Sequence, residues 1–379
     1  MILAAPAGKD HSAIRAISKM KILFVIRAKM GDTLIAYASA RLYADLYPED
    51  EVTLLVRKDY AYLLRNEPGI RLVSFGSRIE MMLKLLWLRL NGETFDVLAI
   101  LWGYGNPIRR IGQLVKARRK ISMDGSFPDI FTEQPSTQDY EQLIDQSWHV
   151  IQVFRPGFPR PVELRLPGLE QRRQPEALLS GAIAVVPLSA EIRKNMDSGA
   201  LETLLLRISE IHPGRRTWIF VNPTDAGAPS ILKMRLPPLA EFRRFSGLVA
   251  LARSLEEVSY WYGVDTGLYH LAVGMGIPTT VFFGPTQPGR VLMPGQPRVQ
   301  WVRAQVLAND HCEEKSCTRP LCLHRAVAGY CDGETSTTLR DVPAACPLRS
   351  FSESELHNVA VAPPGRGGAT LSGSKEVPQ

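Results

Sequence analysis

The sequence contains no run of about 18 uncharged apolar residues, the length that a membrane-spanning helix requires. It has only five cysteines in 379 residues, and all of them lie after residue 311. Its first residues, MILAAPAGKDHSAIRAISKM, lack the charged-then-apolar order of a signal peptide. We therefore expect no transmembrane helix, no secreted disulfide framework and a cytoplasmic location, which leaves peripheral contact with a membrane open.

Two common nucleotide and nucleic-acid signatures are also missing. A nucleotide-binding oxidoreductase would carry G-x-G-x-x-G after its first strand, and the segment after residues 22–26 lacks it. There is no helix-turn-helix or zinc-finger spacing, so nucleic acid is not an expected partner. The formal net charge of +7 instead favours an anionic partner such as a nucleotide, a phosphorylated glycolipid or an acidic membrane surface.

Short apolar runs alternate with helical patterns along most of the chain. Residues 22–26 (ILFVI) have the composition of a buried strand, and residues 33–47 after them have the pattern of a helix. The same alternation restarts at residues 182–186. We therefore predict the α/β class, with two domains that each contain a parallel sheet covered by helices on both faces.

Shifts in composition divide the chain into segments. Residues 155–180 are rich in Pro and Arg, which is typical of a linker, and the residues after Thr286 are expected to be irregular. The predicted segments are a loose extension over 1–20, an N-terminal domain over 21–154, a linker over 155–180, a C-terminal domain over 181–350 with a cysteine-containing segment over 311–346, a helix over 351–362 and a disordered tail over 363–379.

The most informative stretch is 264–286, which reads VDTGLYHLAVGMGIPTTVFFGPT. Its pattern predicts a strand, a turn at Asp265-Thr266-Gly267, a helix, a second strand over 279–283 and a glycine loop. The first N–H groups of a helix lack internal partners and carry the positive end of the dipole, so a phosphate can bind there. Gly267 would let the phosphate approach the backbone. Thr266 and His270 are four residues apart and can share the face that meets it.

An ordinary capped helix is the alternative for this stretch. In that case Asp265 or Thr266 is the N-cap residue, and His270 is only packed or exposed. The stretch nevertheless resembles the donor-site signature of the ADP-heptose:lipopolysaccharide heptosyltransferases, glycosyltransferase family 9. The resemblance rests on Asp-Thr-Gly-x-x-His, the small-residue helix, Gly-x-Pro, the apolar strand and Phe-Gly-Pro-Thr.

The resemblance implies a GT-B fold, which consists of two Rossmann-like domains with the active site in the cleft between them. It implies an inverting, single displacement of a sugar from a nucleotide-diphosphate sugar, expected to be ADP-heptose, to a lipopolysaccharide core or related glycan. It also implies that neither a catalytic metal nor a redox cofactor takes part, and it would place the protein in the cytoplasm or at the inner membrane.

A candidate general base follows the first predicted strand. The segment from Arg27 to Asp32 reads Arg-x-x-x-Gly-Asp and is similar to the first motif of the family, in which the Asp is the proposed base. Ligands of open α/β sheets bind at the carboxyl ends of strands. Glycosyl transfer needs a carboxylate that takes the proton of the acceptor hydroxyl. The alternative is that Asp32 only caps the following helix.

Two further donor-site residues follow strands of the C-terminal domain. The family usually has a lysine in the loop after the first strand that contacts the donor phosphate; this position matches Lys194, with Arg193 left open as the contact. An acidic residue that binds ribose hydroxyls corresponds to Asp225. A solvated surface lysine and a turn aspartate are the alternatives.

The acceptor side of the resemblance falls on residues 99–106, where Trp102 could stack on a sugar, and on Arg109 and Arg110, which could meet acidic groups. All three could equally be ordinary surface residues. Here the chain departs from the Asp-x-Gln-Gly of the family, which leaves the acceptor open.

The cysteines do not form the C-x2-C pairs of ordinary zinc sites. They are Cys312, Cys317, Cys322, Cys331 and Cys346, with His311 and His324 nearby. A structural metal and reduced thiols are both open for this segment. For the whole chain we predict a glycosyltransferase of this family; a nucleotide-sugar epimerase on the same fold and a non-catalytic nucleotide- or glycan-binding protein are the alternatives.

Overall fold

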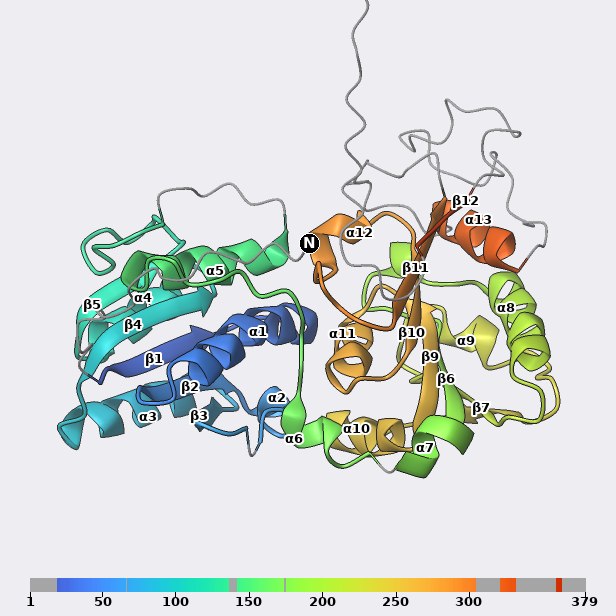
Figure 1. Cartoon of the computed structure of the whole chain (residues 1–379), viewed down its shortest axis with the longest axis horizontal. Coiled ribbons are helices and arrows are strands. Elements are labelled where there is room, and N and C mark those ends of the chain that lie inside the picture. The colour runs from blue at the N-terminus through green and yellow to red at the C-terminus, as the bar shows by residue number, and fades with distance from the viewer. Residues whose placement is uncertain are drawn as a thin grey trace, which may run out of the picture.

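The chain folds around two separate sheets, as the computed structural model in Figure 1 shows. The structure describes residues 19–65, 67–135, 142–173, 175–304, 321–331 and 359–362. The 5-stranded sheet belongs to the N-terminal half and the 7-stranded sheet to the C-terminal half. The predicted α/β class with two mainly parallel sheets is therefore confirmed.

The N-terminal sheet has the strand order β3-β2-β1-β4-β5, and all its strands are parallel. Its elements are β1 (Lys21–Ile26), α1 (Met30–Leu46), β2 (Glu51–Arg57), α2 (Lys58–Ala61), β3 (Ile70–Phe75), α3 (Arg78–Leu90), β4 (Phe95–Trp102), α4 (Asn106–Leu114), β5 (Ala117–Ser122) and α5 (Leu143–Phe154). The central strand β1 is buried on both faces from Ile22 to Ile26, which explains why its sequence is continuously apolar.

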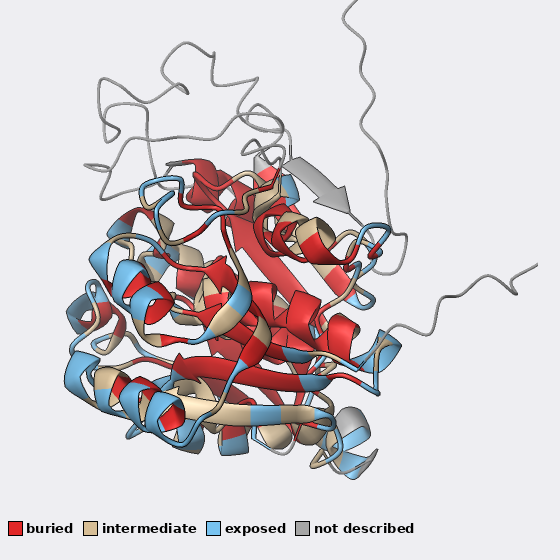
Figure 2. Ribbon diagram, turned by 90° about the vertical axis from the view of Figure 1, so that its left-hand side faces the viewer, coloured by how far each residue is buried: buried red, intermediate tan, exposed pale blue. Residues whose placement is uncertain are grey.

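Successive side chains of β1 point to opposite faces of the sheet and enter different cores. Phe24 packs in the core that α1 and α5 cover, whereas Leu23 and Val25 pack in the core beneath α3 and α4. Figure 2 shows the buried strands at the centre and helices whose outer sides are exposed. The sheet is thus the middle layer of three, as the alternating pattern predicts.

The segment between the two sheets is less loose than its composition suggests. It contains two short helices, α6 (Pro167–Glu170) and α7 (Pro175–Ser180). Its first residue, Arg155, is buried, and its Nη2 lies 2.7 Å from Oδ2 of Asp50. The N–H of Gly168 donates to the buried carboxylate of Glu67 at 3.1 Å. These contacts hold the segment between the two sheets against the N-terminal domain.

The C-terminal sheet has the order β12-β11-β10-β9-β6-β7-β8, parallel except for the antiparallel edge strand β12. Its elements are β6 (Ala182–Val186), a 3₁₀ turn (Ile192–Lys194), α8 (Ser198–Ile211), β7 (Thr217–Phe220), α9 (Ala228–Ile231), β8 (Ala240–Arg243), α10 (Leu248–Glu256), β9 (Val258–Val264), α11 (Gly267–Gly274), β10 (Thr279–Phe283), α12 (Pro288–Val291), β11 (Val299–Ala304), α13 (Leu321–Tyr330) and β12 (Val359–Ala362).

Two expectations for the C-terminal part were wrong. The chain after Thr286 is not irregular, because α12, β11 and α13 follow. Residues 359–362, expected in a helix over 351–362, form β12 instead. Their VAVA sequence is rich in β-branched residues, and pairing with the edge strand β11 offers hydrogen bonds that a short helix end cannot match. The rest of that helix prediction, and the predictions for 1–18 and 363–379, lie outside the described residues.

The two domains share one hydrophobic core. Its members run from α1 and α5 through the linker residues Leu164 and Leu166 to the α10–α11 side of the C-terminal sheet. The opposite face of that sheet packs against α8, α9 and α13. In Figure 1, α1 points toward α11 across the centre of the molecule. Within the described ranges, no helix is both long and apolar enough to cross a bilayer.

Candidate functional site

A pocket of about 670 Å³ lies between the two domains. In each sheet the strand order reverses at one point, between β1 and β4 in the first and between β6 and β9 in the second, and open α/β sheets bind ligands outside the carboxyl ends of strands at such points. The loops after β1, β6 and β9 all reach this pocket. Its lining includes Lys29, Gly31, Asp32, Tyr60, Ser189, Glu191, Arg193, Lys194, Asp265, Thr266, Gly267, His270, Thr286 and Arg290.

Asp32 stands in the first turn of α1. The N-cap position belongs to Lys29, whose side chain makes no capping hydrogen bond, so the alternative that Asp32 is the cap residue does not hold. Burial raises the pKa of the Asp32 carboxyl, and the ammonium groups of Lys29 and Lys194 oppose this effect. A carboxyl with a raised pKa is a stronger base than an ordinary aspartate once it is ionised.

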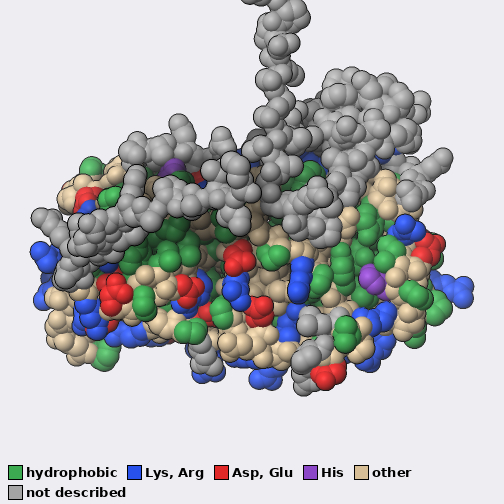
Figure 3. Space-filling view, in the orientation of Figure 1, with side chains coloured by type: hydrophobic (Ala, Val, Ile, Leu, Met, Phe, Trp, Pro, Cys, Tyr) green, Lys and Arg blue, Asp and Glu red, His purple; other side chains and the backbone are tan. Residues whose placement is uncertain are grey.

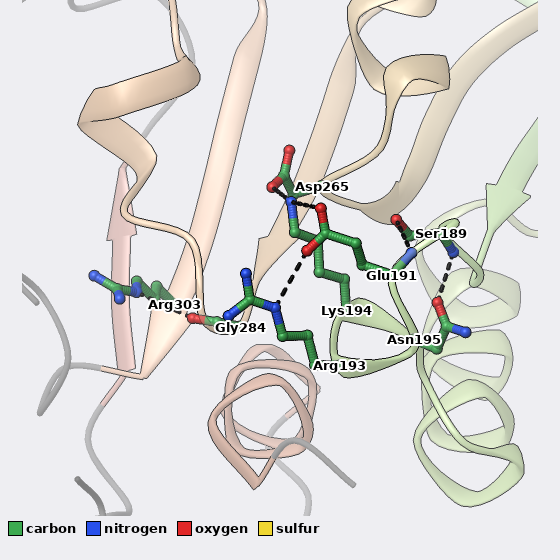
Figure 4. A network of polar contacts seen from close by, with 8 residues as sticks. All are labelled: Ser189, Glu191, Arg193, Lys194, Asn195, Asp265, Gly284 and Arg303. Carbon is green, nitrogen blue, oxygen red and sulfur yellow. Dashed lines mark hydrogen bonds and ion pairs between the residues drawn. The ribbon is translucent and has the colours of Figure 1, made fainter. Parts of the chain in front are cut away.

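Lys194 and Asp265 form an ion pair beyond the carboxyl ends of β6 and β9 (Figure 4). Nζ of Lys194 lies 2.7 Å from Oδ2 of Asp265, and both side chains are largely buried. Burial alone would raise the pKa of Asp265, but the Lys194 ammonium outweighs it and the pKa lies below its usual range. Asp265 therefore stays ionised at neutral pH and holds Lys194 in the pocket.

The loop that carries Lys194 is fixed by its own polar contacts. Nε of Arg193 donates to the carboxylate of Glu191 at 3.2 Å. Arg193 and Lys194, the two candidates for the phosphate contact, both line the pocket. Asn195 accepts a hydrogen bond from the N–H of Ser189 (Figure 4). It also donates to the carbonyl of Ala226. The first bond joins the two ends of the loop, and the second connects it to the loop after β7.

The expected strand, turn and helix at 264–274 are present as β9 and α11. Thr266 is the N-cap residue, yet its side chain makes no capping hydrogen bond within the described chain, and it lines the pocket. His270 also lines the pocket and is buried, which lowers its pKa to about 4. The imidazole is therefore neutral at neutral pH and can donate a hydrogen bond without adding charge.

The first turns of α1 and α11 pack directly against each other through two glycines. A Cβ at Gly267 would lie 2.8 Å from Cε of Met30 and 3.1 Å from N of Gly31. A Cβ at Gly31 would lie 3.1 Å from Cδ2 of His270. Gly267 was expected to make room for a phosphate, and the structure adds a second reason for a glycine there, namely contact between the domains.

Four predicted site residues do not line this pocket. Asp225 lies in the loop after β7, where its carboxylate accepts from the N–H of Asn222 at 3.2 Å, as in a turn. Trp102 is buried at the end of β4. Arg109 and Arg110 are exposed on α4, and the guanidinium of Arg109 lies 5.7 Å from the centroid of the Phe127 ring.

Several pocket residues were missed by the sequence analysis. Arg290 on α12 comes from the segment after Thr286 that was expected to be irregular, and Thr286 ends the predicted glycine loop but was not named as a site residue. Lys29 and Tyr60 come from the N-terminal domain. Lys29 could have been found because it lies in the same short motif as Asp32, directly before the helix that carries it. The position of Arg290 depends on how the chain returns across the domain interface, which no local pattern reveals.

The cysteine segment is tested only in part. Cys322 is buried on α13 and Cys331 follows that helix, whereas Cys312, Cys317 and Cys346 lie outside the described residues. Among the described residues, no group of three or more His, Cys, Asp and Glu side chains is arranged to hold a metal ion.

Comparison with known proteins agrees with the geometry. Residues 246–322 match the family model "Glycosyltransferase family 9 (heptosyltransferase)". The chain is 24% identical over 329 residues to lipopolysaccharide heptosyltransferase 1 of Pseudomonas aeruginosa PAO1, an alignment that covers 79% of this chain and 88% of that protein.

Solved structures share the fold. A family 9 glycosyltransferase from Veillonella parvula matches with a TM-score of 0.59 and 16% identity over 74% of this chain and 85% of that one. E. coli ADP-heptose lipopolysaccharide heptosyltransferase II matches with a TM-score of 0.57 and 16% identity over 77% and 93%. E. coli heptosyltransferase WaaC with ADP matches with a TM-score of 0.57 and 15% identity over 72% and 90%. These structures confirm the predicted fold class. The family model and the P. aeruginosa protein confirm the predicted family resemblance and the prediction of a glycosyltransferase.

Proposed function

We propose that this chain transfers heptose from ADP-heptose to a lipopolysaccharide core or related glycan. The observation that carries the proposal is the pocket between the domains, which joins Asp32 on one side to Lys194, Thr266 and His270 on the other. Lipopolysaccharide heptosyltransferase 1 of P. aeruginosa aligns over most of the chain, and its name supplies the sugar and the acceptor class.

In the proposed reaction Asp32 is the general base. Its carboxylate takes the proton of the acceptor hydroxyl while the hydroxyl oxygen attacks the anomeric carbon of the sugar. The bond between that carbon and the diphosphate oxygen breaks, and its electron pair leaves with the diphosphate. Attack from the side opposite to the leaving group inverts the anomeric centre. The raised pKa of Asp32 supports this role, because it makes the ionised carboxylate a better proton acceptor.

The leaving diphosphate needs partners that are already in place when its charge grows. The Lys194 ammonium, the first amides of α11, the Thr266 hydroxyl and the neutral His270 imidazole can supply them from one side of the pocket. Asp265 is a positioning residue in this scheme, because its carboxylate contacts Lys194. Arg193 and Arg290 add further positive charge to the lining.

Binding of the ribose by Asp225 and of the acceptor by Trp102, Arg109 and Arg110 remains a prediction. These residues stand at or near strand ends of the two domains but outside the pocket. Asp225 is connected to the pocket through its neighbour Ala226, whose carbonyl accepts a hydrogen bond from Asn195 of the Lys194 loop.

A transfer assay tests the proposal. The purified protein is incubated with ADP-heptose and lipopolysaccharide that lacks heptose, and ADP release and the mass of the acceptor are measured. We expect ADP release that depends on the acceptor, and an acceptor heavier by one heptosyl group. A new isomer of the nucleotide sugar formed without acceptor would identify an epimerase. Tight ADP binding without turnover on any glycan acceptor would refute an enzymatic function.

A further inference from the structure

Helix α3 exposes an unusual apolar surface. The side chains of Ile79, Leu83, Leu86, Trp87 and Leu90 are 73%, 61%, 41%, 63% and 76% exposed. They stand at i, i+4, i+7, i+8 and i+11 and therefore share one stripe about 100° wide along the helix. We call these five residues the α3 stripe. Scattered exposed leucines need no explanation, but a continuous stripe on a 13-residue helix does.

The stripe is not the core face of the helix. Met81, Leu85 and Leu88 lie on the opposite side and pack in the core beneath α3 and α4. The N-cap Ser77 accepts a hydrogen bond from the N–H of Glu80 at 3.1 Å, so the helix is capped as well as packed. The stripe is thus held on a stable helix that already has its own apolar contacts.

Basic residues outnumber acidic ones on α3 and on the neighbouring helix α4. The sequences of α3 and α4 contain five basic residues and one acidic residue: Arg78, Lys84, Arg89, Arg109 and Arg110 against Glu80. The two helices pack together, and the Nη1 of Arg89 donates to the carbonyl of Gln113 at the end of α4. At the left-hand end of the molecule, where α3 lies in Figure 1, apolar side chains stand among basic and acidic ones in Figure 3.

We propose that the α3 stripe docks on an anionic phospholipid surface. A capped helix with exposed Leu, Ile and Trp side chains and basic neighbours matches the helices that lie in the plane of a membrane interface. The indole of Trp87 suits the headgroup region, where one edge is apolar and the other hydrated. Arg78 and Arg89, on the same helix as the stripe, meet lipid phosphates, so both the apolar and the charged features of the surface have partners.

The dimensions and charge of the stripe argue against a second copy as its occupant. Thirteen residues span about 20 Å of helix, and a stripe about 10 Å wide covers roughly 200 Å². A stable protein interface buries about 800 Å² on each partner. Two copies would also bring like charges together, because Arg78 and Arg89 flank the stripe on both.

The proposal does not depend on the chemistry of the pocket. The pocket borders the first turn of α1, which covers the opposite face of the N-terminal sheet from α3. Variants of the stripe should therefore leave ADP binding unchanged. A failed membrane experiment and a failed transfer experiment would be separate results.

Vesicle flotation tests the proposal. The full chain is mixed with vesicles of phosphatidylcholine alone or of phosphatidylcholine with phosphatidylglycerol. We expect binding to the anionic vesicles only, and on the order of tenfold weaker binding for the double variant Leu83→Ser with Trp87→Ser. Arg78→Gln with Arg89→Gln should weaken binding about fivefold for each charge removed. The matched control is Leu206→Ser, because Leu206 is 55% exposed on α8 of the other domain. It should bind like the wild type.

Three outcomes would overturn the proposal. The first is that the wild type does not bind anionic vesicles at low salt. The second is that the stripe variants bind as tightly as the wild type, because binding would then rest on net charge alone. The third is a concentration-dependent dimer in sedimentation that Leu83→Ser with Trp87→Ser dissolves while vesicle binding is absent. Melting temperatures of all variants, measured beside the flotation, verify that they remain folded.

Discussion

The buried pair of Lys194 and Asp265 allows a prediction that separates stability from donor binding. The side chains are 17% and 7% exposed, and Lys194→Met would leave the Asp265 carboxylate buried without its partner. Removal of one member of a buried pair costs about 3–5 kcal/mol, and the partial exposure of Lys194 places the expected cost near the lower value. At about 2–4 °C per kcal/mol, the melting temperature should fall by about 6–12 °C.

Adding Asp265→Asn to Lys194→Met should restore most of the lost stability. The double variant has no buried charge at this point, and replacing a buried pair by neutral groups is often neutral. ADP affinity should behave differently. Lys194→Met should weaken ADP binding about tenfold or more, because a hydrogen bond to a charged group is lost. The double variant should not recover it. Asp265→Asn alone keeps the ammonium but removes the carboxylate that holds it in place, so it should weaken ADP binding less than Lys194→Met does.

Differential scanning calorimetry gives the stabilities and isothermal titration gives the ADP affinities.

The pair also makes the stability of the protein depend on pH. Because the pKa of Asp265 is lowered in the folded state, its stabilising contribution is present above the ordinary aspartate pKa of 3.8 and is lost as the pH falls through the folded value. The double variant should lack this acid loss. If Lys194→Met melts like the exposed control Leu206→Ser, or if the double variant is no more stable than the single one, the reasoning about the pair is refuted.

Three further predictions concern the other side chains of the pocket. Asp32→Asn should keep near-normal ADP affinity in calorimetry and lower the transfer rate by about 10²–10⁴. The wild-type rate should fall at acid pH with a midpoint above the ordinary aspartate pKa of 3.8, because burial raises the pKa of Asp32, and the variant should lack this fall. His270→Ala should slow transfer by about 10²–10³, with the same pH profile as the wild type between about pH 5 and 8, since the imidazole is already neutral there; an altered profile in that range would contradict a neutral His270. Gly267→Ala should weaken ADP binding in calorimetry without a change in far-ultraviolet circular dichroism. The added Cβ would meet Met30 and Gly31 at 2.8 and 3.1 Å and force the first turns of α1 and α11 apart. Unchanged ADP affinity would show that the contact yields without opening the pocket.

The predicted site residues that line the pocket share one property. Asp32, Lys194, Thr266 and His270 all follow a strand that borders the point where its sheet reverses order. Strand periodicity and turn residues are local signals, and a parallel sheet brings the carboxyl ends of its strands to one edge. The pocket could therefore be predicted from short stretches of sequence, without knowledge of how the domains pack.

The features that the sequence analysis missed depend on tertiary contacts. Residues 359–362 become a strand because the edge of β11 is available to them. Arg290 reaches the pocket because α12 follows β10 at the domain interface. Arg155 is buried because its guanidinium pairs with the carboxylate of Asp50, which lies before β2 in the N-terminal domain. In each case a distant partner decides the position, and periodicity within one segment carries no information about that partner.

The charges of the pocket predict that both domains are needed to bind a diphosphate. Its lining contains four basic side chains, three acidic ones and a neutral imidazole: Lys29, Arg193, Lys194 and Arg290, then Asp32, Glu191 and Asp265, then His270. The side chains alone thus leave a small positive excess, and the N-termini of α1 and α11 each add about half a positive charge. The sum is close to the two negative charges of a nucleotide-sugar diphosphate, at about +2. Half of the helix contribution comes from each domain, so a cleft that opened would lose affinity for the donor even with every side chain in place. Gly31 and Gly267 allow the two helix ends to lie near one another, because a Cβ at either position would meet the other helix at about 3 Å.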